Sequence, residues 1–278
     1  MTTQRILITG ASGGVAGLLR PRIIAPGRSL RLLDIADPPE LSELDSITDS
    51  TPDEEIVIGS VTDLGLMEQA CRGMDALIHL GGLSVEAAAD DIVDVNIKGT
   101  ITALEAARRA GVPRVILASS NHAVGFQPRT DRPIPADAPH RPDTYYGLSK
   151  VAMEGAGRMY HDRFGIDVIC LRIGSWFAGV SDLRGLATWM SPADGARLIE
   201  ACLRVESPGY RVVWGISRNT RRWFSLDEGE AVGYHPVDDS EIFAPALIAE
   251  HGEPDFDADA ALNRVGGPWT YVELGKRM

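Results

Sequence analysis

Long hydrophobic runs are missing from this 278-residue sequence, whose apolar stretches are as short as Ile6-Leu7-Ile8 and Ala76-Leu77-Ile78. A membrane helix needs about 20 apolar residues in a row, so we expect no membrane partner. The segment Met1–Arg5 leads at once into a strand-like run and leaves no room for a secretory signal, so we expect a cytoplasmic protein. Biased tracts are also missing, which excludes fibrous and disordered classes.

Cysteine and lysine are both scarce. The three cysteines, Cys71, Cys170 and Cys202, form no Cys-x-x-Cys pair and stand among apolar residues, so we expect buried, reduced thiols. Only three of the 27 basic residues are lysines, and 39 acidic residues give a formal net charge of −12. This balance argues against a nucleic-acid partner and for solubility.

Short β-branched segments alternate with longer amphipathic segments over the first two-thirds of the chain. This alternation predicts an α/β fold, a Rossmann-type doubly wound parallel sheet with helices on both faces. The predicted strands are nearly continuously apolar, which is typical of strands buried on both faces. They are Arg5–Thr9, Leu30–Asp34, Ile56–Ile58, Ala76–Leu80, Arg114–Ala118, Asp167–Arg172 and Arg211–Trp214. The predicted helices are Asp63–Arg72, Ile92–Ala110, Asp143–Phe164 and Pro192–Arg204.

A glycine-rich turn, Thr9-Gly10-Ala11-Ser12-Gly13-Gly14-Val15-Ala16, follows the first predicted strand. Backbone amides and a helix N-terminus at such a turn can bind a pyrophosphate, and Gly10 and Gly13 lack the Cβ that would block it. The second strand ends in Asp34, 24 residues after Gly10, where a carboxylate can accept hydrogen bonds from ribose hydroxyls. Because a 2′-phosphate would be repelled there, the sequence predicts NAD rather than NADP. Ser60 and Val61, after the third strand, are predicted to contact the adenine edge.

Tyr146 and Lys150 stand four residues apart at the start of a predicted helix and therefore share one helical face. A tyrosine is a poor base at neutral pH, but a neighbouring ammonium and a cationic nicotinamide both favour its phenolate. Such a phenolate can remove a hydroxyl proton. A surface Tyr and Lys is the ordinary alternative. The catalytic interpretation is favoured by Ser120, because the carboxyl end of a parallel strand is where such a sheet presents its chemistry.

Together, Thr9-Gly10-x-x-Gly13-x-x-Ala16, Asp34, His79-Leu80-Gly81-Gly82, Asn96, Ser120 and Tyr146-x-x-x-Lys150 resemble an extended short-chain dehydrogenase/reductase over about the first 175 residues. Further short segments resemble the uronate dehydrogenase family of that superfamily, and this resemblance extends to about Pro236. The segments are residues 78–86, 118–122, 172–175, 184–189 and 212–215. The sequence departs from the pattern at Ala16, which replaces a third glycine, at Ser60, where relatives often carry aspartate, and in its long C-terminal extension.

The resemblance implies oxidation of the anomeric carbon C1 of pyranose D-glucuronate or D-galacturonate to the aldarolactone, with NAD as cofactor. Tyr146 would remove the C1 hydroxyl proton and Ser120 would hydrogen-bond the same oxygen. Lys150 would hold the nicotinamide ribose and lower the pKa of Tyr146, and Asn96 would anchor Lys150 through a water. Arg184 would bind the substrate carboxylate through its guanidinium fork, although a solvated loop arginine is the alternative that its position alone favours.

The implied site residues fall into three groups. The catalytic residues are Tyr146, Lys150, Ser120 and Asn96. The cofactor-binding residues are Gly10, Ser12, Gly13, Gly14, Val15, Asp34, Ser60, Val61, Leu80, Gly81, Gly82, Asn96, Tyr146, Lys150 and Ile173. The substrate-binding residues are Ser84, Ser120, Asn121, His122, Tyr146, Ser175 and Arg184. No metal is expected, because no second histidine at ligand spacing accompanies His122.

We expect one compact structural domain with three parts. Residues 1–175 form the NAD-binding Rossmann core, residues 176–265 supply substrate-binding loops, the last strand and a C-terminal helical segment, and residues 266–278 form a flexible tail. The proline-rich stretch Phe126–Arg141 and the stretch Trp176–Ser191 are long enough to cover a site. A homo-oligomer is expected, because many relatives pair through the helices that match Ile92–Ala110 and Asp143–Phe164.

Two alternative functions stay open at this point. One is a nucleotide-sugar epimerase or dehydratase of the same superfamily, which usually has a larger and more basic C-terminal part. The other is a noncatalytic NAD-sensing protein, which typically loses the Tyr or Lys that are both present here.

Overall fold

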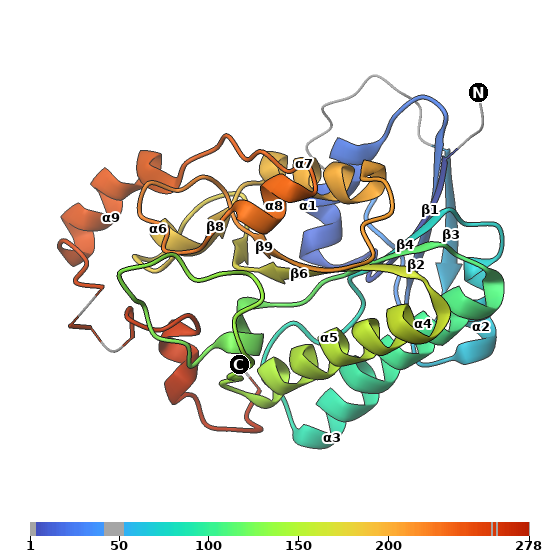
Figure 1. Cartoon of the computed structure of the whole chain (residues 1–278), viewed down its shortest axis with the longest axis horizontal. Coiled ribbons are helices and arrows are strands. Elements are labelled where there is room, and N and C mark those ends of the chain that lie inside the picture. Colours follow the sequence, from blue (N-terminus) through green and yellow to red (C-terminus); the bar gives the residue numbers. More distant parts are fainter. Residues whose placement is uncertain (1–3, 42–52, 257, 260, 278) are drawn as a thin grey trace.

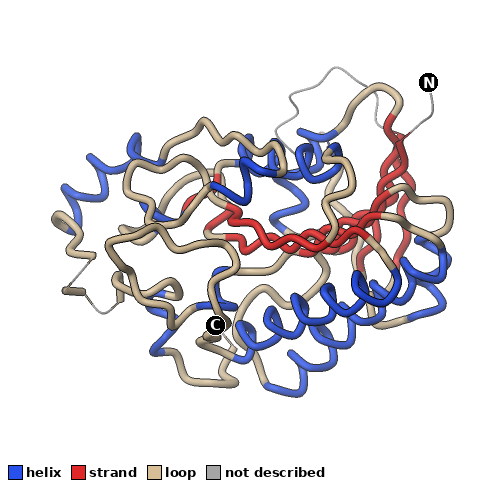
Figure 2. The backbone as a smooth tube through the Cα atoms, in the orientation of Figure 1, coloured by secondary structure: helices blue, strands red, loops and turns tan. Residues whose placement is uncertain are grey.

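The computed structural model describes residues 4–41, 53–256, 258–259 and 261–277. Seven strands form one sheet in the order β3-β2-β1-β4-β5-β6-β9, and every neighbouring pair is parallel (Figures 1 and 2). The strands are β1 Gln4–Thr9, β2 Arg28–Asp34, β3 Asp53–Ile58, β4 Ala76–His79, β5 Arg114–Leu117, β6 Asp167–Ile173 and β9 Tyr210–Gly215, with a separate short pair β7 Ser175–Trp176 and β8 Trp189–Met190. The predicted Rossmann-type doubly wound α/β fold is confirmed.

Helices cover both faces of the sheet (Figure 1). The α-helices are α1 Gly14–Ile23, α2 Leu64–Cys71, α3 Ala89–Asp91, α4 Lys98–Ala110, α5 Tyr145–Phe164, α6 Gly185–Thr188, α7 Pro192–Arg204, α8 Asp227–Ala231 and α9 Ala244–His251. A π-helical turn, η2 Ile92–Ile97, precedes α4, and the 3-10 turns are η3 Asn121–Val124, η4 Ser240–Phe243 and η5 Gly267–Tyr271.

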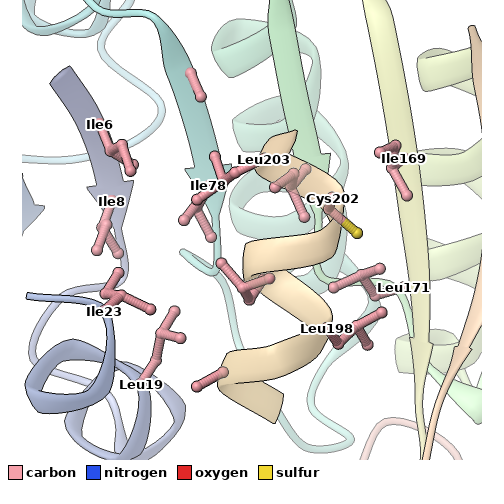
Figure 3. Packing of buried hydrophobic residues seen from close by; sticks show 14 of the residues in the cluster. Ile6, Ile8, Leu19, Ile23, Ile78, Ile169, Leu171, Leu198, Cys202 and Leu203 are labelled. Atoms are coloured by element: carbon pink, nitrogen blue, oxygen red, sulfur yellow. The ribbon is translucent and has the colours of Figure 1, made fainter. Parts of the chain in front are cut away.

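The core lies in two layers, because successive strand side chains point to opposite faces. On one face, strand residues such as Ile8 and Ile78 pack against Leu19 of α1 and Leu198 of α7 (Figure 3). On the other face, Leu7, Leu77 and Leu117 pack with residues of α2, α4 and α5. Both faces of the central strands are therefore buried, which fixes the strand ends that carry the candidate site.

The ends of α5 follow from local sequence. The Thr144 hydroxyl accepts a hydrogen bond from the Gly147 amide (2.9 Å) and caps the N-terminus. At the other end, Gly165 has φ of 71°, a left-handed conformation that glycine adopts without a Cβ penalty. Because the helix begins at Tyr145, Tyr146 lies in its first turn, at the edge of the sheet.

The structure differs from the sequence-based expectations in two elements. The predicted helix Ile92–Ala110 begins as the π turn η2, which contains Asn96, and such turns often occur at functional sites. Strand β3 was expected to be buried on both faces, but Ile56 and Ile58 are 52% and 51% exposed, since β3 is the edge strand of the sheet. The three cysteines are free and buried, as predicted. Among the described residues, no helix has the length and apolarity to cross a membrane.

Candidate active site

Six strands of the sheet carry candidate residues at their carboxyl ends: β1, β2, β3, β4, β5 and β6, which ends in Ile173. The order β3-β2-β1-β4-β5-β6-β9 reverses direction between β1 and β4, so the chain leaves these two neighbours toward opposite faces. A crevice at such a switch point is where open α/β sheets bind ligands. The turn after β1, Asp34 of β2, Gly81 and Gly82 after β4, and Ser120 after β5 all lie at this edge.

The glycine-rich turn passes very close to the segment that follows β4. A Cβ on Gly10 would lie 2.7 Å from the backbone nitrogen of Gly81, and Gly10 has φ of 73°. The turn is closed by a hydrogen bond from the Gly13 amide to the Gly10 carbonyl (3.1 Å). It leads into α1, whose first turn carries no acidic residue, and no side chain in the described part of the chain caps its amides. The backbone amides at this N-terminus are therefore suited to an anion.

Asp34 lies beside the turn, as predicted. Its carboxylate accepts hydrogen bonds from the amides of Ser12 (2.9 Å) and Ile35 (2.6 Å), which fix its orientation at the end of β2. Ser60 lies after β3 and pairs with the Thr62 hydroxyl (2.8 Å), whereas Val61 packs closely over Gly81. The structure thus brings the turn, Asp34, Val61 and Gly81 together at the carboxyl ends of the strands.

The first turns of α5 place Tyr146 and Lys150 together. The Lys150 ammonium lies 5.2 Å from the centre of the Tyr146 ring and donates to the Ala118 carbonyl (2.8 Å) at the end of β5. Burial raises the pKa of Tyr146 to about 12, and hydrogen bonding with Ser120 opposes this rise. Burial also lowers the pKa of Lys150 to about 8, and the charge of Glu154 opposes that shift. Tyr146, Lys150 and Ser120 therefore form one buried cluster.

Asn96 lies in η2, and its direct contacts are with Leu83 and Ser149. Its side-chain oxygen accepts from the Leu83 amide (2.7 Å), and its nitrogen donates to the Leu83 carbonyl (3.0 Å) and the Ser149 hydroxyl (3.1 Å). The side chain therefore ties the segment after β4 to α5. Lys150 donates its hydrogen bond to the Ala118 carbonyl at the end of β5.

The predicted substrate residues Asn121 and His122 follow Ser120 in the turn η3. The Ser120 hydroxyl accepts from the His122 amide (3.2 Å), and His122 Nδ1 pairs with the Asp143 carboxylate (2.7 Å). Burial lowers the pKa of His122, although Asp143 opposes this shift. His122 is therefore a neutral imidazole near neutral pH, with its ring held by Asp143. In the described part of the chain, Nε2 has no hydrogen-bond partner.

Arg184 precedes the first residue of α6 and lies beside the same turn. Its Nη2 donates to the Val265 carbonyl (2.7 Å), and the same carbonyl accepts from Asn121 Nδ2 (3.1 Å). Its Nε is buried without a hydrogen-bond partner among the described residues. Ser175 bonds with Thr188 (2.9 Å) at the other end of α6. Ser84 lies exposed in the segment after Gly82.

The C-terminal segment, here defined as residues 263–277, differs from the flexible tail expected from residue 266 onward. The Gly266 amide bonds to the Gly125 carbonyl (2.8 Å), and the ring of Trp269 in η5 stacks on His122, with ring centres 4.0 Å apart. The Gly275 amide donates to one oxygen of the buried Glu86 carboxylate (2.8 Å), whose other oxygen accepts from the Tyr146 amide (2.9 Å). The segment therefore packs against the start of α5, where the C-terminal end of the chain lies (Figure 1). Through Trp269 it forms a wall beside His122.

Sequence reasoning missed four residues of this site. Asp143 was assigned only to a helix, although an acid three residues before Tyr146 is a signal that it could orient a neighbouring group. Glu86 belongs to the segment 78–86, which supports the family resemblance, but no role in the site was predicted for it. Val265 and Trp269 lay in the region with no motif. Among the described residues, no group of three or more His, Cys, Asp or Glu side chains is arranged to hold a metal ion.

Comparisons with known proteins identify the family of this chain and several relatives. The model of the NAD dependent epimerase/dehydratase family matches residues 6–224. The chain is 41% identical to a uronate dehydrogenase of Pseudomonas putida over 253 residues, 90% of this chain and 91% of that protein. It is 38% identical to an NAD-dependent glucose-6-phosphate dehydrogenase of Haloferax volcanii, over 86% of this chain and 95% of that protein. The crystal structure of a mutant uronate dehydrogenase from Agrobacterium tumefaciens complexed with NAD matches with a TM-score of 0.87 and 34% identity, over 100% of both chains.

Proposed function

The chain belongs to the NAD dependent epimerase/dehydratase family, among its uronate dehydrogenases, and we propose that it oxidises the anomeric C1 of a hexuronate to the aldarolactone with NAD. The substrates are D-glucuronate and D-galacturonate in their pyranose forms. The buried Nε of Arg184, which has no hydrogen-bond partner among the described residues, is the observation that carries the choice of an acidic sugar. A donor in this state favours an anionic ligand that supplies the missing acceptor.

The residues present fit NAD. Gly10 and Gly81 lie so close together that neither position has room for a side chain, so only backbone atoms face the cofactor there. The uncapped backbone amides at the N-terminus of α1 can bind a pyrophosphate. Asp34 can accept hydrogen bonds from ribose hydroxyls and would repel a 2′-phosphate. The amides of Gly14 and Val15 would hold the phosphates, Gly13 would shape the turn that presents them, and Lys150 would hold the nicotinamide ribose. When bound, NAD accepts the hydride that leaves C1 of the sugar.

Tyr146, Ser120 and Lys150 carry out the proton transfer. Tyr146, as its phenolate, removes the proton of the C1 hydroxyl, and Ser120 hydrogen-bonds the same oxygen. A pKa of about 12 would leave little phenolate at neutral pH, so a lower pKa in the complex is required. The Lys150 ammonium, 5.2 Å from the Tyr146 ring centre, supplies a positive charge that lowers it.

The other hydroxyls of the sugar need neutral hydrogen-bond donors and acceptors, and its carboxylate needs one cation. His122, held neutral and oriented by Asp143, offers Nε2 to a sugar hydroxyl, and Ser84, Asn121 and Ser175 supply further polar groups. Arg184 binds the carboxylate through Nε and a second nitrogen of its guanidinium. This assignment distinguishes hexuronates from sugars that carry no anionic group.

The direct test is a substrate panel. We would follow NADH absorbance with NAD and D-galacturonate or D-glucuronate, with glucose 6-phosphate, L-arabinose and UDP-glucose as comparisons. The expected result is NADH formation with both uronates and at least a hundredfold lower kcat/KM for the other sugars, since these leave Arg184 without a carboxylate. Preference for glucose 6-phosphate or L-arabinose would refute the assigned substrate. NAD binding without turnover of any sugar would instead support the noncatalytic alternative.

We also propose that the protein is a cytoplasmic homo-oligomer. Large apolar side chains of η2, α4 and α5, namely Val93, Ile101, Leu148 and Met159, are 44–51% exposed, and burying them supports a subunit interface. The three free cysteines and the need for NAD support a reducing compartment. Light scattering on the purified protein tests the first part, because a monomer at micromolar concentration would refute it.

A further inference from the structure

A buried cluster of charged residues lies directly behind the catalytic pair. Glu154, one helical turn after Lys150 on α5, is 1% exposed, and Arg172 of β6 is 2% exposed. The Glu154 carboxylate accepts two hydrogen bonds from the Arg172 guanidinium, through Nε (3.0 Å) and Nη2 (2.8 Å). Burying an ion pair usually contributes little net stability compared with apolar residues of the same size. The position of this pair beside Lys150 therefore suggests a role in addition to packing.

The same carboxylate holds the strand end that carries the catalytic serine. The Ser119 hydroxyl donates to Glu154 Oε1 (2.6 Å). Ser119 lies between Ala118, whose carbonyl accepts from Lys150 (2.8 Å), and Ser120, whose hydroxyl lowers the pKa of Tyr146 against the effect of burial. Glu154 thus fixes the backbone on which both Lys150 and Ser120 depend.

The charge of Glu154 also acts on Lys150. Lys150 is buried, which favours its neutral form, and Glu154 is the charged group that opposes this effect. Two further titratable groups lie near Lys150. Burial keeps His79 of β4 neutral by lowering its pKa to about 3, and it keeps free Tyr146 protonated by raising its pKa to about 12. The carboxylate itself stays ionised, because Arg172, His140 and Ser119 hold the pKa of Glu154 at about 2 in spite of burial. Cys170 of β6 and Tyr210 of β9 complete its surroundings, and burial keeps both neutral by raising their pKa values.

We propose that Glu154 is a positioning residue for the proton transfer, which keeps Lys150 charged and holds the Ala118–Ser120 backbone in place. This inference rests on the proposed function, because the reaction needs a charged Lys150 beside Tyr146. Glu154 makes no contact with substrate in this proposal and acts only through Lys150 and Ser120.

The first test measures Lys150 without turnover. Lysine occurs only at positions 98, 150 and 276, so the double variant Lys98→Arg/Lys276→Arg leaves one lysine, whose 13Cε NMR shift can be titrated in a labelled sample. In this background, Glu154→Gln should lower the pH midpoint of Lys150 by about one unit, a tenfold change in its ratio of charged to neutral form. A midpoint that Glu154→Gln leaves unchanged would overturn the inference.

The second test uses the pH profile of the reaction. Glu154→Gln should shift the alkaline fall of kcat to lower pH by a similar amount, because Lys150 loses its proton earlier. The KM for D-galacturonate should stay within about threefold, because the variant leaves Arg184 and His122 intact. Equal loss of activity at every pH would indicate a structural role only and would overturn the proposal. A wild-type protein that oxidises no hexuronate would refute the proposed function, while the NMR titration would still decide this inference.

Two control variants separate charge from damage to the fold. Glu154→Gln/Arg172→Met removes both buried charges and leaves no unpaired arginine, and it should keep the altered Lys150 titration. A return to the wild-type titration would overturn the proposal, because the unpaired Arg172 would then be the cause. Glu105→Gln in α4 removes a carboxylate that also accepts from arginines, Arg108 and Arg109, away from the site. It should leave the Lys150 titration and the pH profile unchanged.

Discussion

Replacing Arg184 with methionine should separate acidic from neutral substrates. In the structure Nη2 donates one hydrogen to the Val265 carbonyl, and Nε is buried without a partner among the described residues. A carboxylate would be bound by Nε–H and by the second hydrogen of Nη2, which form one fork. A hydrogen bond to a charged group contributes about 1.5–3 kcal/mol. Two such bonds, less the cost of ordering the substrate, give an expected loss of about 3–4 kcal/mol, or roughly 10²–10³-fold in kcat/KM.

The assay compares kcat/KM for D-galacturonate with that for L-arabinose at saturating NAD. L-arabinose has no carboxylate, so any slow oxidation of it should change by less than about threefold in Arg184→Met. Arg184→Lys should recover part of the activity with galacturonate, because it keeps the charge but lacks the planar fork. A similar fall for both sugars would refute the carboxylate role.

The fold of Arg184→Met should survive, which keeps this test informative. The Val265 carbonyl retains its hydrogen bond from Asn121 (3.1 Å), so the C-terminal segment keeps one of its two anchors at this point. We expect the free energy of unfolding to fall by no more than about 1 kcal/mol, the net value of one hydrogen bond. Urea denaturation of both proteins measures this difference.

Three further predictions follow from the cofactor and proton sites. Tyr146→Phe should lower kcat by about 10³-fold or more, with the Kd for NAD by calorimetry unchanged within about threefold, because only the phenol oxygen is removed. Appreciable turnover would exclude Tyr146 as the base. Asp34→Ala should narrow the preference for NAD over NADP at least about tenfold in kcat/KM, since the carboxylate that repels a 2′-phosphate is gone; an unchanged ratio would contradict its assignment. Gly10→Ala should lower the free energy of unfolding by about 1–3 kcal/mol, because φ is 73° and the new Cβ would lie 2.7 Å from the Gly81 nitrogen. Gly14→Ala is the matched control, since a Cβ there meets no atom within 4 Å, and equal destabilisation of both variants would refute the argument.

The core and the strand ends could be predicted from the sequence, because their signals are local. Continuous apolar runs such as Arg114–Ala118 mark buried strands, and the glycine-rich turn must follow the first of them. The four-residue spacing of Tyr146 and Lys150 places both on one helix face in any α-helix. These features need no knowledge of distant contacts, and the structure brings them together at one edge of the sheet.

The wall formed by the C-terminal segment could not be predicted in the same way. Val265 and Trp269 meet Asn121 and His122 across more than 140 positions of sequence. Neither lies in a periodic pattern, and both fall outside residues 6–224, which the family model matches. The π turn at Asn96 escaped prediction for another reason, since its apolar periodicity is nearly that of an α-helix.

The position of the C-terminal segment also affects when the enzyme becomes active during its synthesis. The turn after β1, Asp34, Ser120 and Tyr146 leave the ribosome well before Val265 and Trp269, so the nucleotide-binding part can fold while the substrate side is still open. A nascent chain should therefore bind NAD before it can enclose a sugar. The same order makes fusions and proteolysis after residue 263 a direct threat to activity, although they would leave the sheet intact.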